Sequence, residues 1–112
     1  MHIYKIFRAE EWSALVAGGE TRGAQVDLAD GFIHFSTARQ LAETARRHFA
    51  AEDGLVLAAV RADGLGDALR WEPSRGGAMF PHLYRSLMLS EIVWHRPILL
   101  EDGRHVLPEG IT

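Results

Sequence analysis

The sequence contains no cysteine, so disulfide bonds, a catalytic thiolate and cysteine-ligated zinc are all excluded. Long apolar runs are missing too, because the longest, Leu55 to Val60, is far too short to cross a bilayer. The N-terminus has neither the basic region nor the apolar core of a signal peptide. These absences lead us to expect a cytoplasmic protein that makes no membrane contact.

A strong charge of either sign is also absent, since 12 basic and 15 acidic residues give a net charge of −3. A nucleic-acid-binding domain usually carries a basic surface, so we expect no nucleic-acid partner. The chain has 112 residues, 47% of them apolar, which is typical of one globular domain spanning 1–112. Composition does not define the oligomeric state.

Strands are predicted from alternating or continuous apolar residues. His2–Phe7 and Phe32–Phe35 alternate, whereas Leu55–Val60 is uniformly apolar, as in a strand buried on both faces. Shorter strand candidates follow at 68–72, 82–85, 92–96 and 104–107.

Helices are predicted in the first half of the chain. Ala9–Ala17 carries an apolar stripe and is stopped by Gly18-Gly19. Thr37 and Gln40 have the spacing of a capping box that opens a second helix. Glu20–Asp30 reads as a polar connection. Helices gathered early and strands late indicate the α+β class.

His34 is the first candidate for function, because it lies in an otherwise apolar strand on the same face as Phe32 and Ser36. A buried imidazole without a partner costs about 1–3 kcal/mol, so this ring needs hydrogen-bond partners or a ligand. Two interpretations stand: a ligand-binding residue in a cleft, or a core histidine bonded to a backbone carbonyl.

His82 and Tyr84 form the second candidate. Their i, i+2 spacing puts both on one strand face, where they offer a donor, an acceptor and an aromatic surface. Pro81 limits strand pairing at that end, so we expect this segment either at a sheet edge or entering from a loop. The alternative is a pair of amphipathic side chains at the rim of the core.

Arg70, Trp71 and Glu72 form the third candidate. Alternation places Arg70 and Glu72 together and turns Trp71 toward the core. Glu72 acts as a general base if desolvation raises its pKa; otherwise it pairs with Arg70 or faces water. The histidines lack metal-ligand spacing, and we expect no metal.

Three segments together resemble an uncharacterised bacterial family known as domain of unknown function 952: Gly31–Thr37 (GFIHFST), Leu69–Pro73 (LRWEP) and Gly77–Tyr84. The opening Ile3–Ile6 and Trp12 are also similar to it. The resemblance covers nearly the whole chain, with several motifs in the same order.

That family is similar in fold to the ADP-ribosyltransferase superfamily, which binds NAD in the cleft of a split antiparallel sheet. The resemblance implies a small, split, mostly antiparallel sheet with two or three helices. It implies that Lys5 or Tyr4 replaces a ribose-holding histidine and that His34 lies beside the nicotinamide. His82 stands where a catalytic glutamate is usual, so the resemblance argues against ordinary ADP-ribosyl transfer.

The leading hypothesis is a protein that binds NAD, ADP-ribose or a related nucleotide in a histidine-lined cleft, with ADP-ribosyl- or phospho-transferase chemistry if it is an enzyme. The alternatives are a non-catalytic ligand sensor or protein-interaction module, and a small-metabolite hydrolase that uses Glu72 and the histidines. The predicted catalytic residues are His34, His82 and Glu72. The predicted ligand-binding residues are Lys5, Arg22, Ser36, Thr37, Arg75, Phe80 and Tyr84.

Overall fold

The computed structural model describes residues 1–112 except for the side chain of Arg75. Its largest sheet has four antiparallel strands in the order β1-β4-β8-β9. These strands are β1 (His2–Phe7), β4 (Leu55–Arg61), β8 (Ile92–Glu101) and β9 (Arg104–Val106). The predicted strand at His2–Phe7 is confirmed, and so is the buried strand that begins at Leu55.

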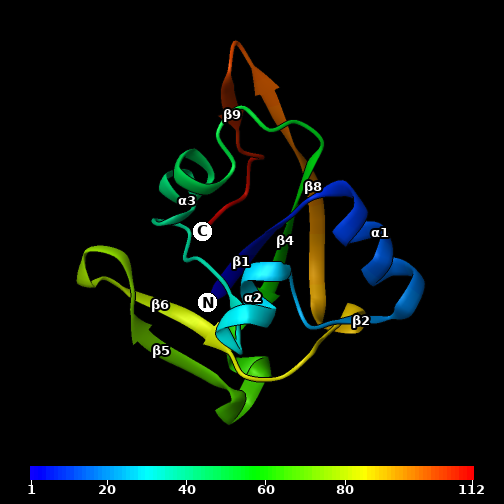
Figure 1. Cartoon of the computed structure of the whole chain (residues 1–112), viewed down its shortest axis with the longest axis vertical. Helices are drawn as coiled ribbons and strands as arrows, with labels where there is room; N and C mark the ends of the chain where they lie inside the picture. The colour runs from blue at the N-terminus through cyan, green and yellow to red at the C-terminus, as the bar shows by residue number, and fades with distance from the viewer.

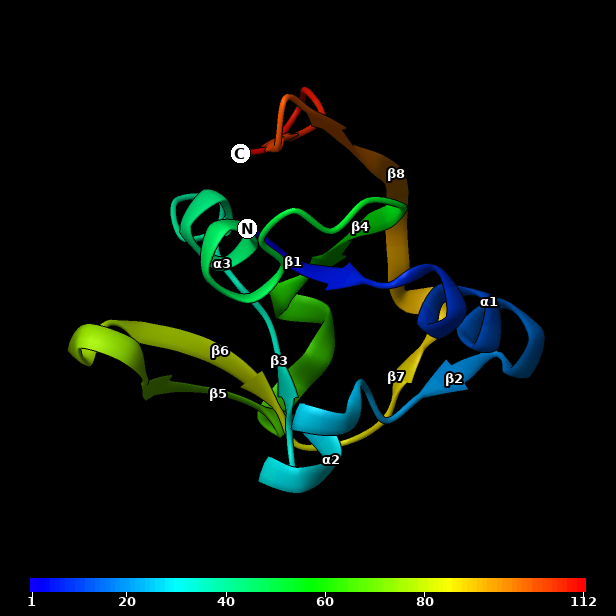
Figure 2. The same cartoon turned by 45° about the horizontal axis from the view of Figure 1, so that its top comes forward.

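A second antiparallel sheet has three strands in the order β3-β6-β5: β3 (Ile33–His34), β5 (Leu69–Pro73) and β6 (Met79–Leu83). Ser36, just after β3, joins it to the first sheet through two 2.8 Å backbone hydrogen bonds with Tyr4 of β1. The strands therefore curl into a half-barrel. The β5–β6 hairpin extends away from the body of the molecule (Figures 1 and 2).

Three main helices accompany the sheets: α1 (Ala9–Gly18), α2 (Gln25–Asp30) and α3 (Leu41–His48). The prediction of α1 and its glycine stop is confirmed, because Gly19 has a φ of 81° and its N–H bonds to the carbonyl of Leu15. The backbone N–H of Thr37 and that of Gln40 each donate to the other's side-chain oxygen, just before α3 begins. The α+β class is confirmed. No helix among the described residues is long and apolar enough to span a membrane.

The predicted polar connection Glu20–Asp30 was wrong. It contains α2 and a short strand, β2 (Glu20–Thr21), which pairs with β7 (Leu87–Met88). Both elements are too short to show a hydrophobic period, and α2 leaves Val26 and Leu28 exposed. The connections that remain are the 3₁₀ segments η1 (Ala62–Ala68), η2 (Arg75–Gly77) and η3 (Leu89–Glu91).

Two local expectations were also wrong. Pro81 lies in the central strand β6, not at a sheet edge or in a loop. The carbonyl and the nitrogen of a strand residue face the same neighbouring strand. The Pro81 carbonyl accepts from the N–H of Phe35, so the proline nitrogen also faces away from β5, and its missing hydrogen removes no hydrogen bond between β5 and β6. Trp71 is 38% exposed because β5 projects from the body and leaves that face uncovered.

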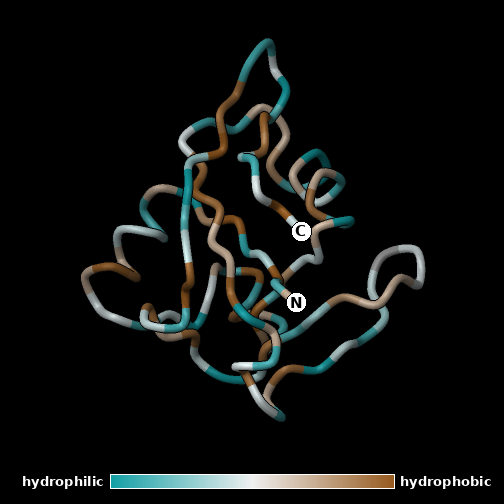
Figure 3. Tube along the Cα trace, turned by 180° about the vertical axis from the view of Figure 1, so that it is seen from behind, coloured by the Kyte–Doolittle hydropathy of each residue, from teal (hydrophilic) through white to brown (hydrophobic). Residues whose placement is uncertain are grey.

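The core has two parts, one on each side of β1 and β4. Alternate residues supply them: Ile3 and Phe7 of β1 pack into one part, whereas Tyr4 and Ile6 pack into the other with Leu41 of α3. Apolar stretches run through the central strands, and the tip of the β8–β9 hairpin is hydrophilic (Figure 3). Tyr4 also bonds through its hydroxyl to the C-terminal Thr112, which holds that end against the sheet.

Candidate functional site

The site begins at a reversal of the chain between α2 and β3. Gly31 follows the helix in the left-handed conformation, with a φ of 86°, and its N–H donates to the carbonyl of Asp27. Glycine adopts this conformation without steric cost. The chain then runs back along the helix, and this brings His34 against Asp27.

Asp27 is the buried centre of the site, with a side chain 0% exposed to solvent. Its Oδ1 accepts from the ring Nδ1 of His34 at 2.6 Å and from the backbone N–H of His34 at 3.1 Å. Its Oδ2 accepts from the Lys5 ammonium at 2.9 Å and from the N–H of Ala24 at 2.8 Å. Both oxygens are saturated, so Asp27 fixes the imidazole and is not left to bind a ligand.

Acid should weaken the fold by removing the charge of Asp27. Burial alone would raise the pKa of Asp27, but the hydrogen bond from His34 and the charge of Lys5 outweigh it and lower the pKa from 3.8 to about 2. Because the folded-state pKa is the lower one, the stabilisation is present above about pH 4 and is lost as the pH falls toward 2. The shift corresponds to about 2 kcal/mol. Urea denaturation across this range should show a larger acid loss in the wild type than in Asp27→Asn, which keeps only the loss from carboxylates such as Glu52, Glu72 and Glu91, and equal losses would contradict this.

The second nitrogen of His34 also faces a carboxylate: Nε2 lies 3.0 Å from Oδ2 of Asp30, at the C-terminal end of α2. The His34 side chain is 32% exposed, so this histidine lies at the surface of a cavity and is not a core residue. Carboxylates only accept hydrogen bonds, and both contacts of the ring are therefore satisfied when each nitrogen carries a proton.

His82 is held in a second carboxylate–histidine pair. It lies directly opposite His34 on β6, and its Nδ1 is 2.8 Å from Oε1 of Glu72 on β5. The same oxygen accepts from the hydroxyl of Tyr84 at 2.7 Å, while the Arg70 guanidinium lies over the tyrosine ring. Hydrogen bonds from His82 and then Tyr84 lower the pKa of Glu72, and the bond to Glu72 raises the pKa of Tyr84.

Phe32 connects the two pairs. Its ring stacks on His82 with centroids 4.1 Å apart, and lies 4.6 Å from the ring of His34 and 5.1 Å from that of Tyr84. The two imidazoles meet edge to face at 5.4 Å. Aromatic contacts of this kind contribute about 0.5–1.5 kcal/mol each beyond burial, so Phe32 helps to fix both rings.

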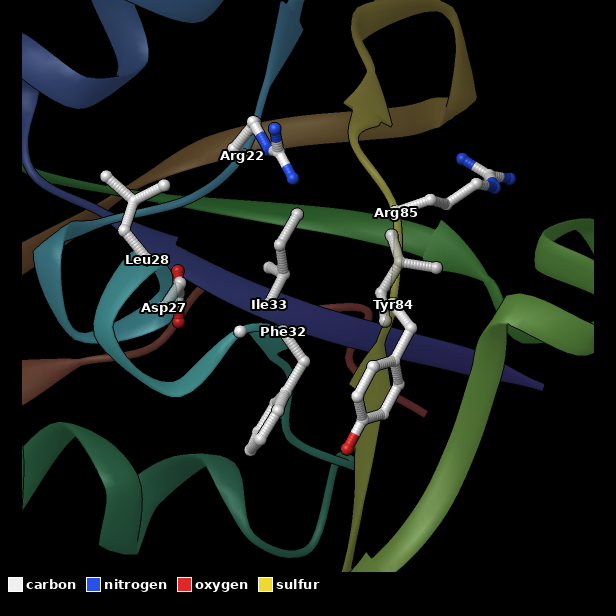
Figure 4. Close-up of a pocket in the computed structure, with 9 residues that line it drawn as sticks. Arg22, Asp27, Leu28, Phe32, Ile33, Tyr84 and Arg85 are labelled. Atoms are coloured by element: carbon white, nitrogen blue, oxygen red, sulfur yellow. The ribbon is translucent and has the colours of Figure 1, made fainter.

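Two cavities lie beside these rings and share Asp27 alone. The large one, about 950 Å³, is lined by His34 and His82 and lies between β1, α2 and the second half of α3, which adds Thr44 and His48. The small one, about 80 Å³, is lined by Phe32 and Tyr84 (Figure 4). Figure 4 shows Arg22 and Arg85 at the end of the small cavity opposite the two rings. A ligand that touches both histidines therefore occupies the large cavity.

Comparison with known proteins supplies the family. Residues 6–95 match the family model described as "Protein of unknown function (DUF952)". The chain belongs to this family. It is similar to the crystal structure of CC0527 from Caulobacter crescentus, with 50% identity, a TM-score of 0.91, and coverage of 95% of this chain and 94% of that one. The solution structure of CC0527 gives 49% identity, a TM-score of 0.83, and coverage of 93% and 90%. No curated protein matches.

In this DUF952 member, the predicted site residues fall into three groups. His34, His82, Lys5, Ser36 and Phe80 line the large cavity. Arg22 and Tyr84 line the small one. Glu72 and Thr37 line neither, although Glu72 contacts His82 and Thr37 begins the turn before α3. Arg75 lies outside the described side chains. Ser36 is buried and shares a 2.9 Å hydrogen bond with Thr44.

Sequence reasoning missed the residues that orient His34, namely Asp27 and Asp30. The signal was present: a carboxylate three residues after Ala24 fits the capping of a short helix, and Gly31 fits its stop. Recognising that helix would have placed both carboxylates next to the GFIHFST segment. Among the described side chains, no group of three His, Asp or Glu residues is arranged to hold a metal ion.

Proposed function

We propose that the large cavity binds a nucleotide-class small molecule, such as NAD, ADP-ribose or one of their nucleosides, against His34 and His82. One observation carries the proposal: two histidines from different strands line one cavity with rings 5.4 Å apart, each held at Nδ1 by a carboxylate. Convergent polar groups in a large cavity are typical of ligand sites. The resemblance of the GFIHFST strand to ADP-ribosyltransferases supports a ribose-containing ligand and a fold of that type.

The pair is suited to acid–base chemistry on such a ligand. Glu72 accepts the Nδ1 proton of His82, so the neutral ring keeps an unprotonated Nε2 that can receive a proton. His34 donates to Asp30 through Nε2, and a ligand atom that replaces the half-exposed Asp30 carboxylate there would receive that proton. Transfer at the ribose or at an adjacent group would use His82 as the base and His34 as the acid, with no proton taken by Glu72.

A second candidate is hydrolysis of a small metabolite, favoured by the 2.8 Å contact between Glu72 and His82. Here His82 removes a proton from water. The lowered pKa of Glu72 keeps this carboxylate ionised, so it orients His82 and does not act as the general base itself.

Removing either histidine should weaken ligand binding. Isothermal titration of NAD, ADP-ribose, adenosine and nicotinamide riboside into the wild type should give saturable binding, and His34→Ala and His82→Ala should each raise Kd by roughly 10–100-fold, since each loses a hydrogen bond worth about 1–3 kcal/mol. His95→Ala is the matched control because His95 is exposed on β8 and packs on Trp12.

Measuring turnover of the bound ligand distinguishes an enzyme from a non-catalytic sensor. Proton NMR of the same mixtures reports a transferred or hydrolysed ligand if the protein is an enzyme, and an unchanged bound ligand if it is a sensor. Absence of heat and of any thermal shift with all four probes at millimolar concentration would refute the proposal, since even weak ligands stabilise the native state.

A further inference from the structure

The cations of the large cavity are already engaged within the protein. The Lys5 side chain is 7% exposed, and its ammonium contacts Asp27 at 2.9 Å and donates to the carbonyl of His34 at 3.4 Å. Arg8 donates two hydrogen bonds, of 2.8 and 2.9 Å, to Glu52. A phosphate entering the cavity would therefore compete with a carboxylate for either cation.

Apart from the histidines His34, His48 and His82, the described charged groups that line this cavity are acidic in excess: Lys5 and Arg8 are set against Glu10, Glu11, Asp27 and Asp30. Asp27 is saturated, but the other carboxylates keep accepting capacity. Asp30 uses one oxygen on His34, and Glu10 is exposed and makes no ion pair or hydrogen bond with another described side chain. The cavity therefore offers acceptors to a ligand and repels added negative charge.

We propose that, within the nucleotide class, this cavity takes the nucleoside portion: an uncharged or cationic ligand that is rich in hydrogen-bond donors. The inference rests on the proposed function. Ribose hydroxyls and ring amino or amide groups donate to Asp30, Glu10 and the free nitrogen of His82. The planar ring lies against the apolar lining that Phe80 and Phe49 supply. Any phosphate of the ligand lies outside the cavity.

The hydroxyls of the cavity fit the same ligand. Ser36 and Thr44 bond to each other at 2.9 Å, and either oxygen can be the donor in that bond. A hydroxyl of the ligand can join this pair as donor or acceptor, whereas a phosphate dianion requires donors alone. Phosphate sites in proteins gather arginines, backbone N–H groups or a helix N-terminus. Here Lys5 and Arg8 are paired with carboxylates, and the two helix N-termini that line the cavity already carry acidic side chains, Asp27 on α2 and Glu10 and Glu11 on α1.

Matched pairs of ligands test the inference. Isothermal titration at low ionic strength compares adenosine with adenosine monophosphate, and nicotinamide riboside with nicotinamide mononucleotide. The added phosphate should weaken binding at least tenfold in each pair, roughly the effect of one unfavourable charge contact. Glu10→Gln should reduce that difference, while Glu101→Gln, at the tip of the β8–β9 hairpin, should leave it unchanged.

The outcomes separate this inference from the proposed function. Nucleotides that bind as tightly as their nucleosides, or more tightly, would overturn the inference and leave the proposed function standing. If these four ligands fail to bind and NAD and ADP-ribose fail as well, both fail; if NAD or ADP-ribose binds and none of these four does, only the inference fails. A difference that Glu10→Gln does not reduce would also count against the inference, because the discrimination would then come from somewhere other than the acidic lining.

Discussion

Replacing Asp27 with alanine should destabilise the protein by about 3–5 kcal/mol, the usual cost of removing one partner from a buried ion pair. The carboxylate is fully buried, and its loss leaves the Lys5 ammonium nearly buried without a counter-charge. The N–H groups of Ala24 and His34 lose their acceptor as well. Small domains are stable by only about 5–15 kcal/mol, so this is a large share of the total.

Urea denaturation at neutral pH measures the effect. Asp27→Asn should lie between the wild type and alanine, because one amide oxygen still accepts while its NH₂ faces donors. Asp63→Ala is the matched control: it breaks an exposed, solvent-screened ion pair with Arg61 and should leave the stability nearly unchanged. A loss for Asp27→Ala no greater than that for Asp63→Ala would show that the cluster around Asp27 does not stabilise the fold.

The dependence on Asp27 also explains why α2 was not predicted. A helix of six residues is too short to be stable by itself, and it forms because the rest of the protein holds it. The holding contacts come from Lys5 and His34, both outside the segment Glu20–Asp30. Longer elements such as β1 and α1 carry their own hydrophobic period, and their boundaries were predicted closely.

The candidate site was likewise predicted only in part. Alternation along each strand predicted that His34 shares a face with Phe32 and His82 with Tyr84. The Phe32–His34 ring contact agrees with the first pairing, and the bonds of His82 and Tyr84 to the same oxygen of Glu72 agree with the second. Alternation does not predict which strands are neighbours in the sheet. The pairing of His34 opposite His82 depends on β6 being the central strand, where the presence of Pro81 predicted an edge or a loop.

The role of Glu72 depends on contacts between strands, which its neighbours in the sequence do not reveal. Both interpretations from the sequence, a desolvated general base or a partner of Arg70, describe the carboxylate by its neighbours along β5. In the structure its partners, His82 and Tyr84, come from the adjacent strand and its continuation. The resulting pKa is lowered, not raised, so Glu72 acts on the site through His82.

Gly23→Ala should be nearly as damaging as the loss of Asp27, about 3 kcal/mol or more. Gly23 has a φ of 97°, and a Cβ built on it would lie 2.1 Å from Oδ2 of Asp27. A flexible side chain could move aside at little cost, but this carboxylate is buried and bonded to the N–H of Ala24 and to Lys5. The substitution therefore forces either the loop or the whole cluster around Asp27 to shift, which breaks the contacts that orient His34.

Gly31→Ala is the matched control, because it isolates the backbone cost. Gly31 also has a positive φ, 86°, yet nothing lies within 4 Å of its added Cβ. It should lose only the strain of a left-handed alanine, about 1–2 kcal/mol. The difference between the two variants in urea denaturation thus measures the contact with Asp27. Equal losses of stability in the two variants would mean that the loop at Gly23 can move away from Asp27 at no extra cost. The packing of that loop would then not be needed to hold Asp27 against His34.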